Sequence, residues 1–270
     1  MNDPRTAVRI RFGSHSVAIT SEASQILEGI RDAFSFMISH EPCDLAGRFT
    51  VRSVGEGYAI EEETAVDAGH GSQVETLHAL RYSMIQHFMD ARDDLVWFHG
   101  GAAASSGRAV LLPGPRGRGK STLVDALCAR GWEYVSDDVL PVAYSDLAVE
   151  PFPQTPAFRE HPGEEKPEEW LLTARKRVVR LDPRQVCDRP QRIGAFVFPA
   201  YQPGASATIE PRSPATAALA LLEGCWDFPR HRERAVERVA ELADRIPAYD
   251  VTFSDGAAAA ALVAETLRER

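Results

Sequence analysis

The chain has few cysteines and lacks both a secretory signal core and a membrane-length apolar run. Its four cysteines, Cys43, Cys128, Cys187 and Cys225, form no C-x-x-C pair, so the spacing of zinc ribbons and thioredoxin-like motifs is missing. The first ten residues, MNDPRTAVRI, contain no apolar core, and no apolar run approaches the roughly 20 residues of a membrane helix. These features predict a cytoplasmic protein with reduced thiols and no membrane partner.

Positive charge is also in short supply. The sequence has 30 Lys and Arg against 39 Asp and Glu, a net charge of −9. A general nucleic-acid surface is therefore disfavoured, and small molecules, peptides or proteins are the expected partners. The 270 residues can bury the core of one large or two small domains, and we find no internal repeat.

The most informative segment is a phosphate-binding loop. Residues 114–121 read GPRGRGKS, a match to G-x-x-x-x-G-K-[ST], between a strand predicted over 109–113 and a helix over 121–130. Glycines let backbone N–H groups converge on anionic oxygens, Lys120 adds a cation, and Ser121 offers a hydroxyl to Mg²⁺. We therefore expect nucleotide contacts from Gly114, Pro115, Arg116, Gly117, Arg118, Gly119, Lys120, Ser121 and Thr122.

The segment before the loop predicts a small α+β unit. Residues 7–20 and 47–62 alternate apolar and polar side chains around glycine turns, as two hairpins would. Ser72 and Glu75 form a capping-box signature for a helix reaching about residue 92. We place the small unit over residues 1–70 and a larger domain over 71–270.

The rest of the larger domain alternates strands and helices, which predicts an α/β fold. A proline-rich, charged stretch over 151–169 resists regular structure and is expected to be a loop, a natural lid or acceptor dock. The remaining expected elements are strands over 95–98, 178–181, 194–198 and 249–253, and helices over 214–224, 231–245 and 255–268.

Two adjacent carboxylates follow the strand predicted over 132–136. Asp137 and Asp138 would lie at its C-terminal edge, where open α/β sheets bind their ligands. Phosphoryl transfer needs one carboxylate near Mg²⁺, and transfer to a hydroxyl benefits from a second that accepts a proton. Because successive strand residues point to opposite faces, we expect the two to differ in role, and one of them could simply cap a turn.

A histidine ends the apolar strand over 95–98. His99 precedes Gly100 and Gly101, and the neighbouring strand feeds the phosphate loop. Its imidazole could hydrogen-bond a phosphate or orient an acceptor hydroxyl, and the alternative is a buried structural histidine.

Four short segments together resemble the bacterial HPr kinase/phosphorylase family and its shorter relatives. They are HG at 99–100, GPRGRGKS at 114–121, ARGW at 129–132 and SDDV at 136–139. The resemblance implies a phosphoenolpyruvate-carboxykinase-like P-loop kinase core with a mixed sheet. It further implies that Asp137 is the catalytic base, that His99 lies near the reacting phosphate and acceptor, and that Ser121 and Asp138 serve Mg²⁺. Lys120 would join the catalytic residues by neutralising charge on the β- and γ-phosphates.

Two departures from the family concern the acceptor. Thr122 follows the loop serine where HPr kinases usually carry an acidic residue, and their downstream glycine-rich signature is missing. Both argue against HPr as the acceptor. In length and loop style the chain is more similar to the shorter relatives, which include kinases that phosphorylate a serine of a lasso-peptide precursor. Arg159 is a candidate clamp for phosphate or for an acidic peptide, as are Arg116 and Arg118, and a solvated surface position is the alternative for each.

The sequence thus favours an ATP- and Mg²⁺-dependent kinase that phosphorylates a hydroxyl, in the first place a serine of a peptide or protein. A kinase of small metabolites and a non-catalytic ATP-binding accessory module are the alternatives. The pairing of His99 and Asp137 with Lys120 argues against the module, because binding alone needs no proton acceptor. Family kinases often form oligomers, so a homo-oligomer is compatible with the resemblance.

Overall fold

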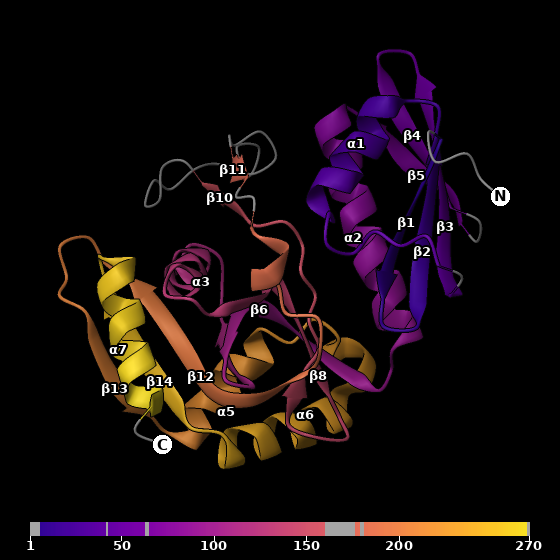
Figure 1. Cartoon of the computed structure of the whole chain (residues 1–270). Helices are drawn as coiled ribbons and strands as arrows, with labels where there is room; N and C mark the ends of the chain where they lie inside the picture. The colour runs from indigo at the N-terminus through magenta and orange to yellow at the C-terminus, as the bar shows by residue number, and fades with distance from the viewer. Residues whose placement is uncertain (1–5, 42, 63–64, 160–175, 179–180, 269–270) are drawn as a thin grey trace. The chain divides into compact units, whose positions relative to one another are not determined.

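The computed structural model describes residues 6–41, 43–62, 65–159, 176–178 and 181–268, which fall into two compact units (Figure 1). The chain passes from the first unit to the second between Asp93 and Asp94. No helix in these ranges is long and apolar enough to cross a bilayer.

Among the described residues, the first unit consists of a five-stranded sheet and two helices. The strands follow sequence order across the sheet, with β2 and β3 parallel and the other neighbours antiparallel. The hairpins predicted over 7–20 and 47–62 are confirmed. The elements are β1 (Ala7–Phe12), β2 (His15–Ser21), α1 (Ser24–Ala33), β3 (Asp44–Val54), β4 (Gly57–Glu62), β5 (Ala65–Gly71) and α2 (Gln73–Ala91).

Helix α2 belongs to the first unit, so that unit ends later in the sequence than the predicted residue 70. Ser72 and Glu75 form the predicted capping box at its start. Its buried Leu80, Met84 and Phe88 face the first sheet, on which the helix packs. An amphipathic helix belongs with the sheet that buries its apolar face, so the first unit extends to Asp93 rather than ending at 70.

The second unit is built on a seven-stranded mixed sheet in the order β13-β14-β12-β7-β6-β8-β9. Strands β7, β12 and β14 are parallel, and the other neighbours are antiparallel. The expected α/β fold with a mixed sheet is therefore confirmed. The strands are β6 (Leu95–Ser105), β7 (Arg108–Pro113), β8 (Glu133–Ala143), β9 (Ala148–Val149), β12 (Gln191–Tyr201), β13 (Thr208–Arg212) and β14 (Ala248–Phe253).

Helices cover both faces of this sheet, and each face has its own apolar cluster. Alternate residues of β7 enter different clusters, Leu111 on the side of α5 and α6, and Leu112 on the side of α3 and α7. The helices are α3 (Lys120–Ala129), η1 (Pro183–Gln185), α5 (Pro214–Glu223), α6 (Phe228–Arg245) and α7 (Gly256–Arg268). In the described part of this unit the four α-helices were predicted from the sequence, within a few residues.

Three segments differ from expectation or lie outside the described residues. Of the strand expected over 178–181, residues 179 and 180 lie outside the described part of the chain. The strand expected over 132–136 continues as β8 to Ala143, so the two aspartates lie inside a strand rather than at its end. Of the loop expected over 151–169, residues 160–169 are outside the described part of the chain. The short strands β10 (Ala157–Arg159) and β11 (Lys176–Val178) stand on either side of that segment.

Candidate functional site

The loop between β7 and α3 has the backbone of a phosphate-binding turn. Gly114, Gly117 and Gly119 all have positive φ, at 136°, 83° and 90°, in a region that other residues rarely adopt. A Cβ at Gly119 would also come within 2.7 Å of Cζ of Phe253. Gly119 is the N-cap of α3, so the helix N-terminus and its unpaired N–H groups open onto the loop.

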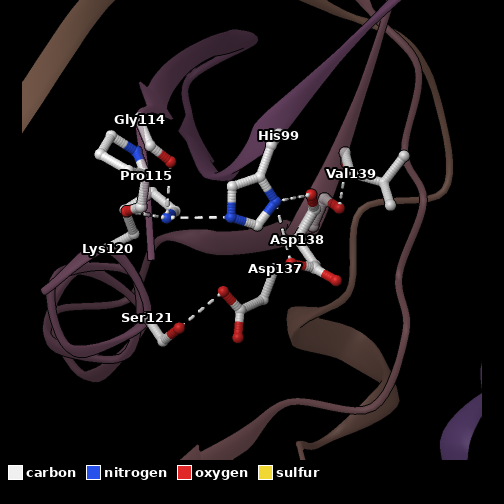
Figure 2. Close-up of polar contacts among 9 residues, drawn as sticks. His99, Gly114, Pro115, Lys120, Ser121, Asp137, Asp138 and Val139 are labelled. Carbon is white, nitrogen blue, oxygen red and sulfur yellow. Dashed lines mark hydrogen bonds and ion pairs between the residues drawn. The ribbon is translucent and has the colours of Figure 1, made fainter. Parts of the chain in front are cut away.

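The lysine of the loop is folded back onto the loop itself. Lys120 is only 6% exposed, and its Nζ donates to the carbonyl oxygens of Gly114 at 2.8 Å and Pro115 at 2.7 Å. The same Nζ lies 3.2 Å from Nε2 of His99 (Figure 2). An ammonium held this way lies beside the cradle in which phosphate oxygens would collect.

The serine of the loop contacts one of the two aspartates. The hydroxyl of Ser121 donates to Oδ1 of Asp137 at 2.9 Å. Asp138 points instead toward the imidazole of His99 (Figure 2). The pair of Ser121 and Asp138 that the resemblance implied for Mg²⁺ is therefore not the pair in contact.

His99 connects the lysine to the second aspartate. Its Nδ1 lies 3.0 Å from the backbone oxygen of Asp138 and 3.0 Å from Oδ1 of the same residue. Both partners are acceptors, so the ring hydrogen resides on Nδ1, and Nε2 keeps a lone pair that accepts from Lys120. The result is a continuous chain of polar contacts from Lys120 through His99 to Asp138.

The second of the two aspartates has an unusual backbone conformation. Asp138 has φ of 121°, although it is not glycine and lies within β8, opposite Gly100 of β6. Strained conformations of this kind cluster at functional sites. The two carboxylates have different partners, Ser121 for Asp137 and His99 for Asp138.

The other predicted loop residues take less central positions. Arg116 and Arg118 are exposed, and the carbonyl of Arg118 accepts a hydrogen bond from the backbone N–H of Tyr201 at 3.1 Å. The methyl group of Thr122 lies next to Gly256 at the start of α7, since a Cβ added at Gly256 would be 3.1 Å from Cγ2 of Thr122. The side chain of Arg159 lies outside the described part of the chain, so its role stays a prediction.

Sequence reasoning missed one neighbour of the site. The indole of Trp226 is stacked on the imidazole of His99, with centroids 5.7 Å apart and planes 13° from parallel. The backbone N–H of His99 donates to the carbonyl of Gly224 at 2.8 Å. No local pattern links residue 226 to residue 99, and only the folded chain brings them together.

The site offers hard oxygen ligands but no complete metal cage. Among the described residues no three His, Cys, Asp or Glu side chains cluster as a metal centre would require. The Ser121 hydroxyl and the Asp137 carboxylate are adjacent oxygen donors, and Mg²⁺ in nucleotide sites typically takes one or two such protein ligands beside phosphates and water. The residues present thus fit a metal that arrives with its nucleotide.

The thiol of Cys128 is not a nucleophile candidate. Burial raises the pKa of Cys128 on α3 to about 12, and the carboxylates of Asp125 and Asp137 act in the same direction. A thiol with so high a pKa stays protonated at neutral pH, so its chemistry does not enter that of the site.

Comparisons with known proteins add little to this geometry. No family model matches the sequence, and no curated protein matches it. Among solved structures, the Hpr(Ser) kinase/phosphatase from Coxiella burnetii is similar over 64% of this chain and 93% of that chain, with 15% identity and a TM-score of 0.31. A likeness that weak transfers neither fold nor activity, and the residues of the site have to support the function themselves.

Proposed function

We propose that the protein is an ATP- and Mg²⁺-dependent phosphotransferase that moves the γ-phosphoryl group to a hydroxyl, that of a serine in a peptide or protein. One observation carries the proposal: the consecutive loop residues Lys120 and Ser121 contact His99 and Asp137, and His99 in turn contacts Asp138. Binding a nucleotide needs the loop and the lysine. The histidine and the second carboxylate are surplus to binding and suit proton transfer.

Phosphate recognition falls to the loop and the start of α3. Backbone N–H groups at a helix N-terminus attract anions, and three glycines with positive φ leave room for close approach. Lys120 is already held over this cradle by the carbonyls of Gly114 and Pro115. A β- or γ-phosphate oxygen is a stronger acceptor for its ammonium than a carbonyl, so the lysine would exchange these partners for the nucleotide.

The metal side of the site consists of Ser121 and Asp137. In phosphate-loop enzymes the loop hydroxyl and a nearby carboxylate hold Mg²⁺ between the phosphates, and here these two side chains are 2.9 Å apart. The metal would neutralise negative charge on the transferred group. Asp137 would keep the serine oriented and supply the balancing negative charge.

The proton side consists of His99 and Asp138. Asp138 holds the hydrogen on Nδ1 of His99, which leaves the lone pair of Nε2 directed at the phosphate loop. When Lys120 turns to the phosphates, Nε2 is placed to take the proton of an acceptor hydroxyl. This assignment interchanges the roles that the resemblance gave to the two aspartates. The alternative, in which Asp137 is the base, is tested by the same variants.

A serine of a peptide remains the favoured acceptor because of the resemblance to kinases of ribosomal-peptide precursors. A small metabolite with a hydroxyl would use the same phosphate site but a smaller acceptor site. An accessory module that only binds ATP would have no use for the contact between His99 and Asp138.

The decisive experiment separates these alternatives. The protein is incubated with Mg²⁺, γ-labelled ATP and a peptide-enriched extract of its source, with Lys120→Ala as the inactive control. Label on peptide serine supports the proposal, and label in small metabolites only replaces the acceptor class. If the protein binds ATP but transfers no label to any fraction, nor to added synthetic serine peptides, the result would favour the non-catalytic accessory module.

A further inference from the structure

We propose that Trp226 is a positioning residue for His99, and that the segment Gly224–Asp227, here called the strap, exists to hold its indole against the imidazole. The kinetic part of this inference rests on the proposed phosphotransfer, whereas the structural part does not. It assigns a task to a tryptophan and a buried acid that the phosphate loop itself does not use.

The stack completes the immobilisation of the imidazole. Nδ1 of His99 donates to Asp138 and Nε2 accepts from Lys120, which fixes both nitrogen edges of the ring. The indole of Trp226 stacks on one face of the ring at a 13° interplanar angle. Edge contacts alone leave the ring free to tilt about the line joining them. A nearly parallel aromatic face removes that freedom and adds the attraction of offset rings.

The strap is attached to β6 by main-chain hydrogen bonds. Strand β7 pairs with residues Gly100–Ser105 of β6. The strap pairs with the preceding residues of β6, 97–99, on the same edge. His99 donates its N–H to the carbonyl of Gly224 at 2.8 Å, and Trp226 donates to the carbonyl of Trp97 at 2.8 Å. Trp226 therefore sits in a register with β6 that places its ring over His99 rather than over a neighbouring residue.

A buried carboxylate locks this register. Oδ1 of Asp227 accepts hydrogen bonds from the backbone N–H of Trp97 at 3.2 Å and from the thiol of Cys225 at 3.3 Å. The backbone of Cys225 forms an antiparallel β-bridge with Phe98 of β6. Asp227 is only 3% exposed, and Nε2 of His231 lies 3.6 Å from its Oδ2. Burying an acid is unfavourable, so its position at the foot of the strap calls for a function.

The consequence is a division between binding and transfer. Without the stack the imidazole can rotate away from the line between Asp138 and the phosphate loop. Phosphate binding by the loop would persist, while proton transfer would lose its fixed geometry. Small misplacements of a catalytic group can slow reactions by about 10- to 100-fold.

The test is a nitrogen NMR experiment on the full-length protein without nucleotide, using ¹⁵N-labelled histidine. Signals of His99 are assigned by their loss in His99→Gln. The wild-type protein is expected to show one protonated Nδ1 and one unprotonated Nε2 for this residue. Trp226→Leu is expected to average the two nitrogens, and Trp226→Phe to restore most of the difference. An unchanged pair of signals in Trp226→Leu overturns the inference.

Two further variants test the lock. Asp227→Asn keeps an oxygen acceptor for the N–H of Trp97 and should retain the wild-type signals, whereas Asp227→Ala should average them as Trp226→Leu does. Trp132→Leu is the matched control, because Trp132 is a partly buried tryptophan packed in the apolar cluster of α3 and α7, beyond the C-terminal end of α3. Should Asp227→Ala fail to fold, the comparison of Trp226→Leu with Trp132→Leu still decides.

Kinetics separate this inference from the proposed function. Trp226→Leu is expected to lower kcat by at least about tenfold while the Kd for ATP changes less than about twofold. If wild-type protein transfers no phosphate, the proposed function fails. The NMR experiment still tests whether Trp226 fixes the imidazole of His99, because it needs no activity. If the signals average as expected but kcat is unchanged, the stack is structural and the positioning role is refuted.

Discussion

The hydroxyl of Ser121 donates to Asp137 at 2.9 Å, while the next residue, Asp138, turns to His99. Two neighbouring carboxylates thus enter the same site from one strand and serve different partners. Asp138 has an unusual φ of 121° within β8. The different partners of the two carboxylates provide the structural basis for separating the metal and proton tasks.

Asp137→Asn tests the metal task. The amide oxygen can still accept the Ser121 hydroxyl, but the negative charge that balances Mg²⁺ is gone. We expect the Mg²⁺ concentration needed for half-maximal transfer to rise by about tenfold or more, the equivalent of about 1.4 kcal/mol. Initial rates over a Mg²⁺ titration measure it. A large loss of rate at saturating Mg²⁺, with an unaltered Mg²⁺ dependence of the residual rate, would make Asp137 the base instead.

Asp138→Asn tests the proton task. An amide no longer holds the hydrogen on Nδ1 of His99 as a carboxylate does, so the reactive tautomer is lost. We expect kcat to fall by about 10²- to 10⁴-fold, with ATP affinity nearly unchanged, as measured by rapid-quench rates and calorimetry. Asp188→Asn, at an exposed site with 88% side-chain exposure, is the control. A loss of ATP binding equal to the loss of rate would contradict this role.

Lys120→Ala removes the cation of the phosphate loop. Hydrogen bonds to charged groups contribute about 1.5–3 kcal/mol, so ATP binding should weaken by about 10- to 100-fold. Titration calorimetry with ATP and Mg²⁺ checks this. The exposed Arg108, at the start of β7, provides the charge-matched control Arg108→Ala, for which affinity should stay within about twofold of wild type. Equal effects of the two variants would count against a direct contact.

Gly119→Ala and Gly107→Ala form a matched pair for stability. Both glycines have positive φ, 90° and 78°, so both substitutions cost about 1–2 kcal/mol of backbone strain. Only at Gly119 does the added methyl approach within 2.7 Å of Phe253, whereas no described atom lies within 4 Å at Gly107. Urea unfolding should therefore show a larger loss for Gly119→Ala. Equal losses would show that the loop can shift away from Phe253.

The pH dependence of Asp227→Asn follows from the buried carboxyl. Desolvation raises the pKa of Asp227 above its ordinary value of 3.8. A raised folded-state pKa means that its contribution is fully present below the unfolded pKa and is lost as pH rises through the folded pKa. The asparagine variant should therefore gain stability relative to wild type as pH increases from about 4 to 7. Urea unfolding at several pH values would refute this if the difference stayed constant or fell.

The sequence predicts those parts of the molecule that local patterns determine. The phosphate loop and α3 follow from spacing and periodicity within about twenty residues, and Ser72 with Glu75 marks the start of α2. A cap shows where a helix begins but not which sheet buries it, and for this reason the first unit was predicted to end too early. Grouping by apolar contacts required the three-dimensional structure.

The sequence indicated which side chains gather at the phosphate loop but not how they pair. Lys120, Ser121, His99 and both aspartates do come together. A single sequence gives no signal for the unusual φ of Asp138, nor for which of the two adjacent aspartates contacts Ser121. The stacking of Trp226 on His99 depends on a register between distant segments, for which a single sequence carries no signal.

The contact of Gly119 with Phe253 ties the phosphate loop to the far end of the chain. Phe253 ends β14, its carbonyl accepts the N–H of Gln202, and the adjacent Tyr201 binds the carbonyl of Arg118. A fragment with only the four recognisable motifs would keep every polar side chain of the site. It would lose Phe253 and Tyr201, which pack against and hydrogen-bond to the phosphate loop. Shortening the protein from its C-terminus should therefore impair nucleotide binding before it removes a single motif residue.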